Sequence, residues 1–191
     1  MPSAHRRSAL AITVRALAAV LAAGCSDPDE LPDATIPNRV DTVTLGALTG
    51  TPVTTPSGFS ASRGAIRTDQ ESGFEFAFNI DAAGTPVFLP LRVLGLVSDD
   101  DFKPGLKRTE LGFAAIRTAE RNDFITDDAV PLAVGDRFFL RSRLLCSSLG
   151  VPYYGKLEVL GIDPAARSVT FQVLVNHNCG YIGLEPGIPS E

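Results

Sequence analysis

Alternation of apolar with polar or small residues is the feature that most constrains the fold of this chain. The clearest runs are Phe74, Phe76, Phe78 and Ile80, and, nearer the C-terminus, Val169, Phe171, Val173 and Val175. Successive side chains of a β-strand point to opposite faces, so this period of two predicts strands that bury one face. A helix would repeat its apolar residues every three to four positions instead.

Turn-forming residues divide the chain into short strands. Residues 81–85 and 163–167 contain Asp, Gly or Pro and are expected to connect strands into hairpins. The expected strands lie within 39–47, 74–80, 87–93, 137–146, 156–162 and 168–176. This pattern predicts a single antiparallel β-sandwich or small barrel of about seven to nine strands, with at most one short helix. Residues 106–122 fit either a strand or that helix, and their Ala, Glu and Arg content favours the helix.

The N-terminal segment predicts export. His5, Arg6, Arg7 and Arg15 precede a short apolar run, and small residues lead up to Cys25. The apolar run is shorter than the roughly 20 residues that a membrane-spanning helix needs. This segment resembles the lipobox of bacterial lipoproteins, with Ala22 standing where Leu is usual.

The resemblance implies that a diacylglycerol is attached to Cys25, that the chain is cut before it, and that the new N-terminus is acylated, commonly with palmitate. Residues 1–24 would then be a signal peptide, 25–38 the lipidated cysteine with a Pro-rich acidic tether, and 39–191 a single β-rich domain. An ordinary secretory signal or an uncleaved anchor is the alternative. Ser26 stands where some bacteria place Asp to retain lipoproteins in the inner membrane, so the outer membrane is favoured if the source has one.

The charge of the mature chain limits its partners. The sequence has 22 acidic and 17 basic residues, and three of the arginines belong to the signal segment, which leaves 14 basic residues and a formal net charge of −8. Such a surface disfavours nucleic acid, because contacts to phosphates supply most of that affinity. The expected partners are the membrane, through the lipid, and an envelope protein or glycan.

The cysteine count agrees with an oxidising compartment. With Cys25 lipidated, Cys146 and Cys179 remain as an even pair, and a disulfide between them is expected. A zinc site would need more ligands than one mature histidine and no Cys-x-x-Cys pair can supply. No metal or cofactor is expected.

Several other residues could carry chemistry, and each has an ordinary structural interpretation. His177 is the one mature histidine, and no Gly-x-Ser-x-Gly motif accompanies it. The acidic residues 99–101, with Asp127 and Asp128, could contribute to a calcium site but lack the alternating spacing of a calcium loop. A solvated acidic loop is therefore the favoured interpretation.

Two groups of side chains are candidates for binding. Arg137, Arg141 and Arg143 share one parity of a strand and could receive a carboxylate or phosphate, or pair with acidic residues of neighbouring strands. Tyr153 and Tyr154, placed in a loop before the strand at 156–162, and Tyr181 could stack on a sugar or contact a protein, or simply pack.

These observations favour a membrane-anchored envelope lipoprotein that acts as a non-catalytic binding or scaffold module. The alternative is a hydrolase that uses a pair of carboxylates on envelope or extracellular glycans, since acidic residues are plentiful. The sequence assigns no catalytic residue, and whether the protein is an enzyme stays open, with a non-enzymatic role favoured.

Overall fold

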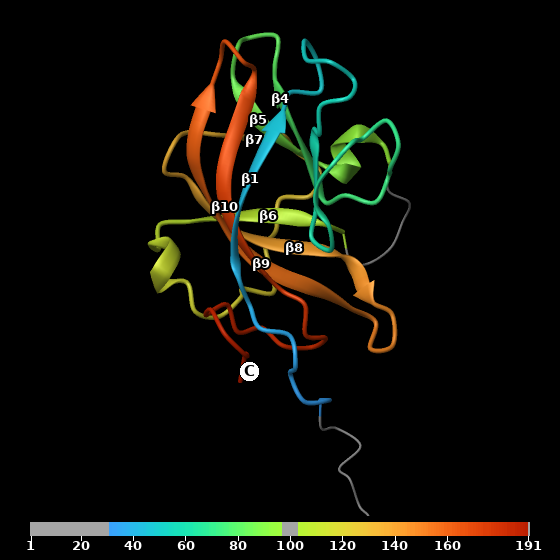
Figure 1. The fold of residues 1–191 in the computed structure, drawn as a ribbon, viewed down its shortest axis with the longest axis vertical. Coiled ribbons are helices and arrows are strands. Elements are labelled where there is room, and N and C mark those ends of the chain that lie inside the picture. The colour runs from blue at the N-terminus through green and yellow to red at the C-terminus, as the bar shows by residue number, and fades with distance from the viewer. Residues whose placement is uncertain (1–30, 97–102, 191) are drawn as a thin grey trace, which may run out of the picture. The chain divides into compact units, whose positions relative to one another are not determined.

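The computed structural model describes residues 31–96 and 103–190, and these form two antiparallel sheets of five strands each (Figure 1). The first sheet contains, in spatial order, β1 (Val40–Gly46), β10 (Ser168–Asn176), β9 (Val151–Asp163), β8 (Arg137–Cys146) and β6 (Gly105–Thr109). The second contains β3 (Gly64–Ile66), β2 (Gly58–Ser60), β4 (Phe76–Ile80), β5 (Pro86–Pro90) and β7 (Val130–Pro131). The predicted antiparallel β-sandwich is confirmed, and the sheets do not close into the alternative barrel.

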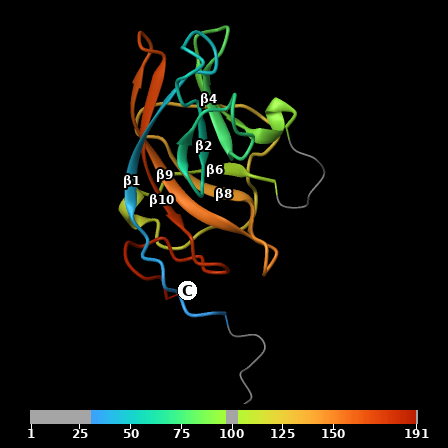
Figure 2. The same cartoon turned by 45° about the vertical axis from the view of Figure 1, so that its right-hand side comes forward.

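The core lies between the two sheets, which face each other in Figure 2. Phe171 of β10 is fully buried, and its ring centroid lies 5.6 Å from those of Phe59 and Phe88 and 6.0 Å from that of Phe76. The predicted alternation is therefore what joins the layers, because the inward residues of β10 meet the inward phenylalanines of the second sheet.

Both predicted hairpins are present. β4 and β5 pair from Phe76 opposite Pro90 to Ile80 opposite Pro86, and β9 and β10 are joined by the turn after Asp163. The predicted disulfide is also confirmed: Cys146 at the end of β8 is bonded to Cys179, with a Cα–Cα distance of 5.6 Å.

The helix favoured for residues 106–122 is wrong. This segment supplies β6, which pairs with β8, and then only a short 3-10 turn, η2 (Phe113–Ala115). The residues that would have formed the apolar face of a helix have nothing to bury, since Leu111, Ala114 and Ala115 are exposed. Pairing with a neighbouring strand thus overrides the helical preference of the composition. A second 3-10 turn, η1 (Leu91–Leu94), follows β5.

The loop predicted around Tyr153 and Tyr154 is likewise a strand, because β9 begins at Val151. The outer face of β8, β9 and β10 is not open to solvent there. Residues 113–124 and 182–184 cover it and bury a second apolar cluster made of Ile116, Ala119, Phe139, Tyr154, Leu174 and Leu184.

Several expectations fall outside the described residues: the signal segment 1–24, the lipidation of Cys25, and the acidic residues 99–101. Within the expected tether, Thr35 and Ile36 donate backbone N–H bonds to Asn178, and Asn38 exchanges backbone bonds with Gly187. These bonds attach the last residues of the expected tether to the sheet domain. No helix among the described residues is long and apolar enough to cross a membrane.

Candidate functional site

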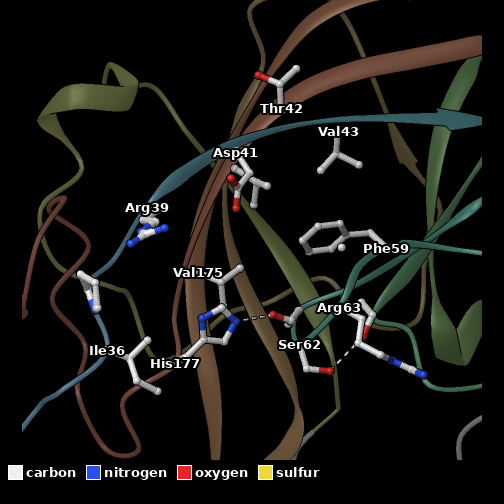
Figure 3. A pocket seen from close by; sticks show the side chains of 15 residues that line it. Ile36, Arg39, Asp41, Thr42, Val43, Phe59, Ser62, Arg63, Val175 and His177 are labelled. Atoms are coloured by element: carbon white, nitrogen blue, oxygen red, sulfur yellow. Dashed lines mark hydrogen bonds between the residues drawn. The ribbon is translucent and has the colours of Figure 1, made fainter.

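A cleft of about 690 Å³ opens between β1 and the hairpin formed by β2 and β3 (Figure 3). These strands lie at one end of each sheet, so the cleft is the gap left where the two layers of the sandwich are not closed against each other. Its floor is apolar and belongs to the core: Val43, Phe59, Val173 and Val175.

Charged and hydroxyl groups line the rim above that floor. Arg39 and Asp41 lie on the β1 side, and both side chains are directed to the same side of β1 as Val43. Among the described residues neither side chain has a hydrogen-bonding or ion-pair partner, and both residues are exposed. Ser62 and Arg63 lie on the opposite side, where Arg63 forms an ion pair with Glu71. The cleft thus offers one unpaired cation and one unpaired anion next to an apolar surface.

The hairpin side of the cleft is held at both backbone polar groups of Ala61. Its N–H donates to Oε2 of Glu75 at 2.5 Å, and its carbonyl accepts from Nε2 of His177 at 2.8 Å. Glu75 precedes β4 in the second sheet, and His177 follows β10 in the first. The turn that borders the cleft is therefore fixed from both sheets at once.

Glu75 is a buried acid. Its side chain has no exposed surface, and Oε1 accepts a hydrogen bond from Nε of Arg143 at 3.1 Å. Burial raises the pKa of Glu75 above its ordinary value, while the hydrogen bond from Ala61 and the charge of Arg143 oppose that rise. Its two carboxylate oxygens accept hydrogen bonds from Ala61 and Arg143, so Glu75 has a structural role and does not face the cleft.

His177 is placed as a structural residue as well. Besides the bond to Ala61, its ring lies edge-on to Tyr153, with centroids 5.3 Å apart. Within the described part of the chain, His177 forms no hydrogen bond with Ser60 or Ser62, whose hydroxyls contact each other at 3.2 Å. With Nε2 directed to a carbonyl, the described geometry does not pair a serine nucleophile with a histidine base.

The three predicted arginines are separated by their environments. Arg137 pairs with Glu158 at 2.9 Å across β8 and β9, as the cross-strand alternative proposed. Arg141 donates to the carbonyl of Lys103 at 2.8 and 3.0 Å and stacks on Phe124. Arg143 turns towards Glu75, so the three do not form one anion-binding stripe.

The predicted tyrosines are also dispersed. Tyr154 is buried in the second apolar cluster, next to Phe124, while Tyr153 packs against the main core and His177. Tyr181 is half-buried beyond Cys179. None of the three lines the cleft, although Tyr153 supports it from behind through His177.

Within residues 31–96 and 103–190 no group of His, Cys, Asp and Glu side chains is arranged to hold a metal ion. Asp127 of the proposed acidic set instead forms an ion pair with Arg92 and accepts a hydrogen bond from Thr126.

Sequence reasoning missed Arg39 and Asp41. A signal was present: both share the parity of Val43 and Leu45, so two charged residues stand on the inward face of a strand. Such a pattern indicates that the sandwich stays open at that end. Comparisons with protein-family models and with curated proteins found no match, so the geometry alone guides the functional argument.

Proposed function

We propose that this protein is a lipid-anchored binding module of a bacterial cell envelope, held at the membrane through Cys25, and that the cleft between β1 and the β2–β3 hairpin takes its ligand. The observation that carries the binding role is the cleft itself. It combines an apolar floor with unpaired Arg39 and Asp41, and few convergent polar groups over an apolar surface are typical of binding sites.

The anchor rests on the lipobox-like segment that ends at Cys25. Two or more acyl chains would hold the protein firmly in the membrane, whereas a single acyl chain binds a membrane only reversibly. The disulfide between Cys146 and Cys179 supports an oxidising compartment outside the cytoplasm.

The hydrolase alternative gains no support from the cleft. A glycosidase of the usual kind needs two carboxylates facing the scissile bond. Asp41 is the one carboxylate among the described residues that line the cleft, and Glu75 behind it is engaged by Ala61 and Arg143. We therefore retain the binding role as the proposed function.

Two measurements test the proposal. The intact mass of the membrane-extracted protein should correspond to a chain that begins at Cys25, carries lipid, and gains two hydrogens on reduction. An uncut or unlipidated chain would remove the anchor from the proposal.

The binding role is tested with a photo-reactive amino acid placed at Ser62, which lies on the rim of the cleft, and a matched control at Leu160, which is exposed on β9. In intact envelopes the Ser62 probe should give a discrete adduct that is lost when Arg39 and Asp41 are both changed to Ala. An equal adduct from Leu160, or an adduct that ignores the double substitution, would contradict binding in the cleft.

A further inference from the structure

We propose that β1 is a site of strand addition: an extended segment of a partner protein, about three to five residues long, pairs with the open edge of β1 and places alternate side chains in the cleft. The inference rests on the binding function proposed above and names the class of its ligand. It follows from the direction of the backbone groups of β1, from the state of the other sheet edges, and from the side chains along the cleft.

The backbone of β1 leaves a row of unpaired groups on the side away from β10. Gly46 donates its N–H to Pro56 at 2.9 Å, and Asn38 exchanges bonds of 2.7 and 3.0 Å with Gly187. These bonds leave β1 on the side opposite β10. Alternate residues of a strand direct their N–H and C=O groups to the same side. Val40, Thr42 and Thr44 therefore point theirs away from β10, and no described residue pairs with them.

The other sheet edges are better protected than β1. The outer edge of β6 is paired with Ile125, β7 is two residues long and includes Pro131, and β3 is three residues long. β1 contains no proline and keeps a regular register with β10 from Val40 to Gly46. Natural sheets usually cover, shorten or bend such an edge, and a regular open one is a template for another strand.

The side chains beside this edge define what would be recognised. Arg39, Asp41 and Val43 face the cleft, whereas the side chain of Thr42 points to the other side of β1 (Figure 3). A strand added to β1 would oppose these three with every second residue of its own. The complementary segment has an acidic, a basic and an apolar residue at alternate positions, with the apolar one above Phe59.

A second copy of the chain fits this edge less well than a partner segment. Pairing two β1 strands about Thr42 would use the whole open stretch but would bring the two Asp41 side chains into diagonal contact, where like charges repel. The edge is also closed by Gly187 at one end and Pro56 at the other, and a second β1 would carry the same two segments with it.

The test uses the full chain in detergent and a displayed library of random nonapeptides as the probe. Enriched peptides should carry the acidic, basic and apolar residues at alternate positions, in either chain direction. On addition of an enriched peptide, the amide protons of Val40, Thr42 and Thr44 should become protected from exchange by about tenfold or more, because they gain hydrogen-bond partners.

A pair of variants separates backbone pairing from side-chain contact. Thr42→Pro removes an N–H that points away from β10, so no bond to β10 is lost. An edge strand tolerates proline at such a position. It should weaken peptide binding about tenfold, as expected for one lost hydrogen bond. Thr42→Ala keeps the N–H and should bind as the parent does. The exchange pattern of the unmodified protein decides the matter even if Thr42→Pro fails to fold.

Three results would overturn strand addition. Enrichment of no peptide would do so, as would peptides that bind while the Thr42 amide stays unprotected. Protection of these amides that rises with protein concentration in the absence of peptide would identify a second copy as the occupant. If the Ser62 probe still gives its cleft-dependent adduct in the envelope, the proposed binding function stands without strand addition; if that adduct is also lost, both fail.

Discussion

Replacing Arg143 with Met should destabilise the protein, and more so at neutral than at acid pH. Arg143 is the charged partner of Glu75, whose side chain is fully buried. Met keeps most of the length of the arginine stem but removes its charge, and it leaves the carboxylate with the backbone N–H groups of Ala61 and residue 143 as its described hydrogen-bond donors. An unpaired buried charge is far more costly than a paired one.

The size of the stability loss follows from the full burial of Glu75 and the partial exposure of Arg143. Removing one partner of a fully buried pair costs about 3–5 kcal/mol. The Arg143 side chain is 28% exposed, so part of its interaction is screened by solvent, and Ala61 retains its bond. We therefore expect a loss of about 2–3 kcal/mol in the free energy of unfolding at pH 7.5. For a domain of this size that corresponds to a fall in Tm of about 5–10 °C.

The pH dependence has a definite sign. Burial raises the pKa of Glu75 above 4.5, so the folded chain holds this proton more tightly than the unfolded chain. Above the unfolded pKa, the contribution of Glu75 to stability therefore falls as pH rises, until the folded pKa is passed. Arg143 is one of the groups that lower this pKa, so its removal extends the fall to higher pH. As pH falls, a larger fraction of the carboxyl is protonated and uncharged, so the loss should be smaller at the acid end of the range than at pH 7.5.

Thermal and chemical unfolding of the oxidised protein between pH 4.5 and 8, followed by circular dichroism, measures this loss. Arg137→Met is the matched control, because its ion pair with Glu158 is partly exposed and should cost under about 1 kcal/mol with little change across this range. Equal losses for Arg143→Met at pH 4.5 and 8, or a loss no larger than that of the control, would refute the reasoning about Glu75.

Two further predictions concern the disulfide and the buried lysine Lys156. Changing both Cys146 and Cys179 to Ser opens a loop whose ends are 33 positions apart. Denaturant titrations should show a free energy of unfolding lower by about 3–4 kcal/mol, and a loss under about 1 kcal/mol would contradict the chain-entropy argument. Lys156→Met removes the ammonium that donates to the carbonyls of Phe113 and Ile116. We expect the free energy of unfolding to fall by about 1–2 kcal/mol and amide exchange around η2 to become faster. Unchanged exchange there would show that Lys156 does not hold residues 113–124 against the sheet.

The β-sandwich, its two hairpins and the disulfide could be predicted because each depends on local information. The parity of Phe76 to Ile80 and of Val169 to Val175 defines the faces buried between the sheets, and turn residues mark the reversals. Phe74 departs from this pattern, because it precedes β4 and packs with Ala77 in a separate cluster. With two cysteines left after the lipidation expected at Cys25, the pairing had no competitor.

The separation of Arg137, Arg141 and Arg143 could not be predicted, because it depends on a register shift inside β8. Pairing with β9 shifts between Arg141 and Leu144, so equal parity no longer means an equal face beyond that point. Arg141 consequently packs on Phe124 of the outer cover, while Arg143 reaches Glu75 of the facing sheet. The cover over the outer face escaped prediction for a related reason: residues 113–124 have no regular period, and only tertiary contacts place them.

The shape of the cleft depends on the buried ion pair between Glu75 and Arg143. Ala61 carries the turn beside Arg63, and its position depends on Glu75 on one side and His177 on the other. Any ligand that needs this turn in place must bind more weakly when Glu75 loses Arg143, although Arg143 does not line the cleft. Since linkage is reciprocal, a ligand bound there should also raise the stability of the parent more than that of Arg143→Met. Equal stabilisation of the two proteins by a cleft ligand would show that the turn is positioned without Glu75, and that the apolar floor and the β1 side alone determine binding.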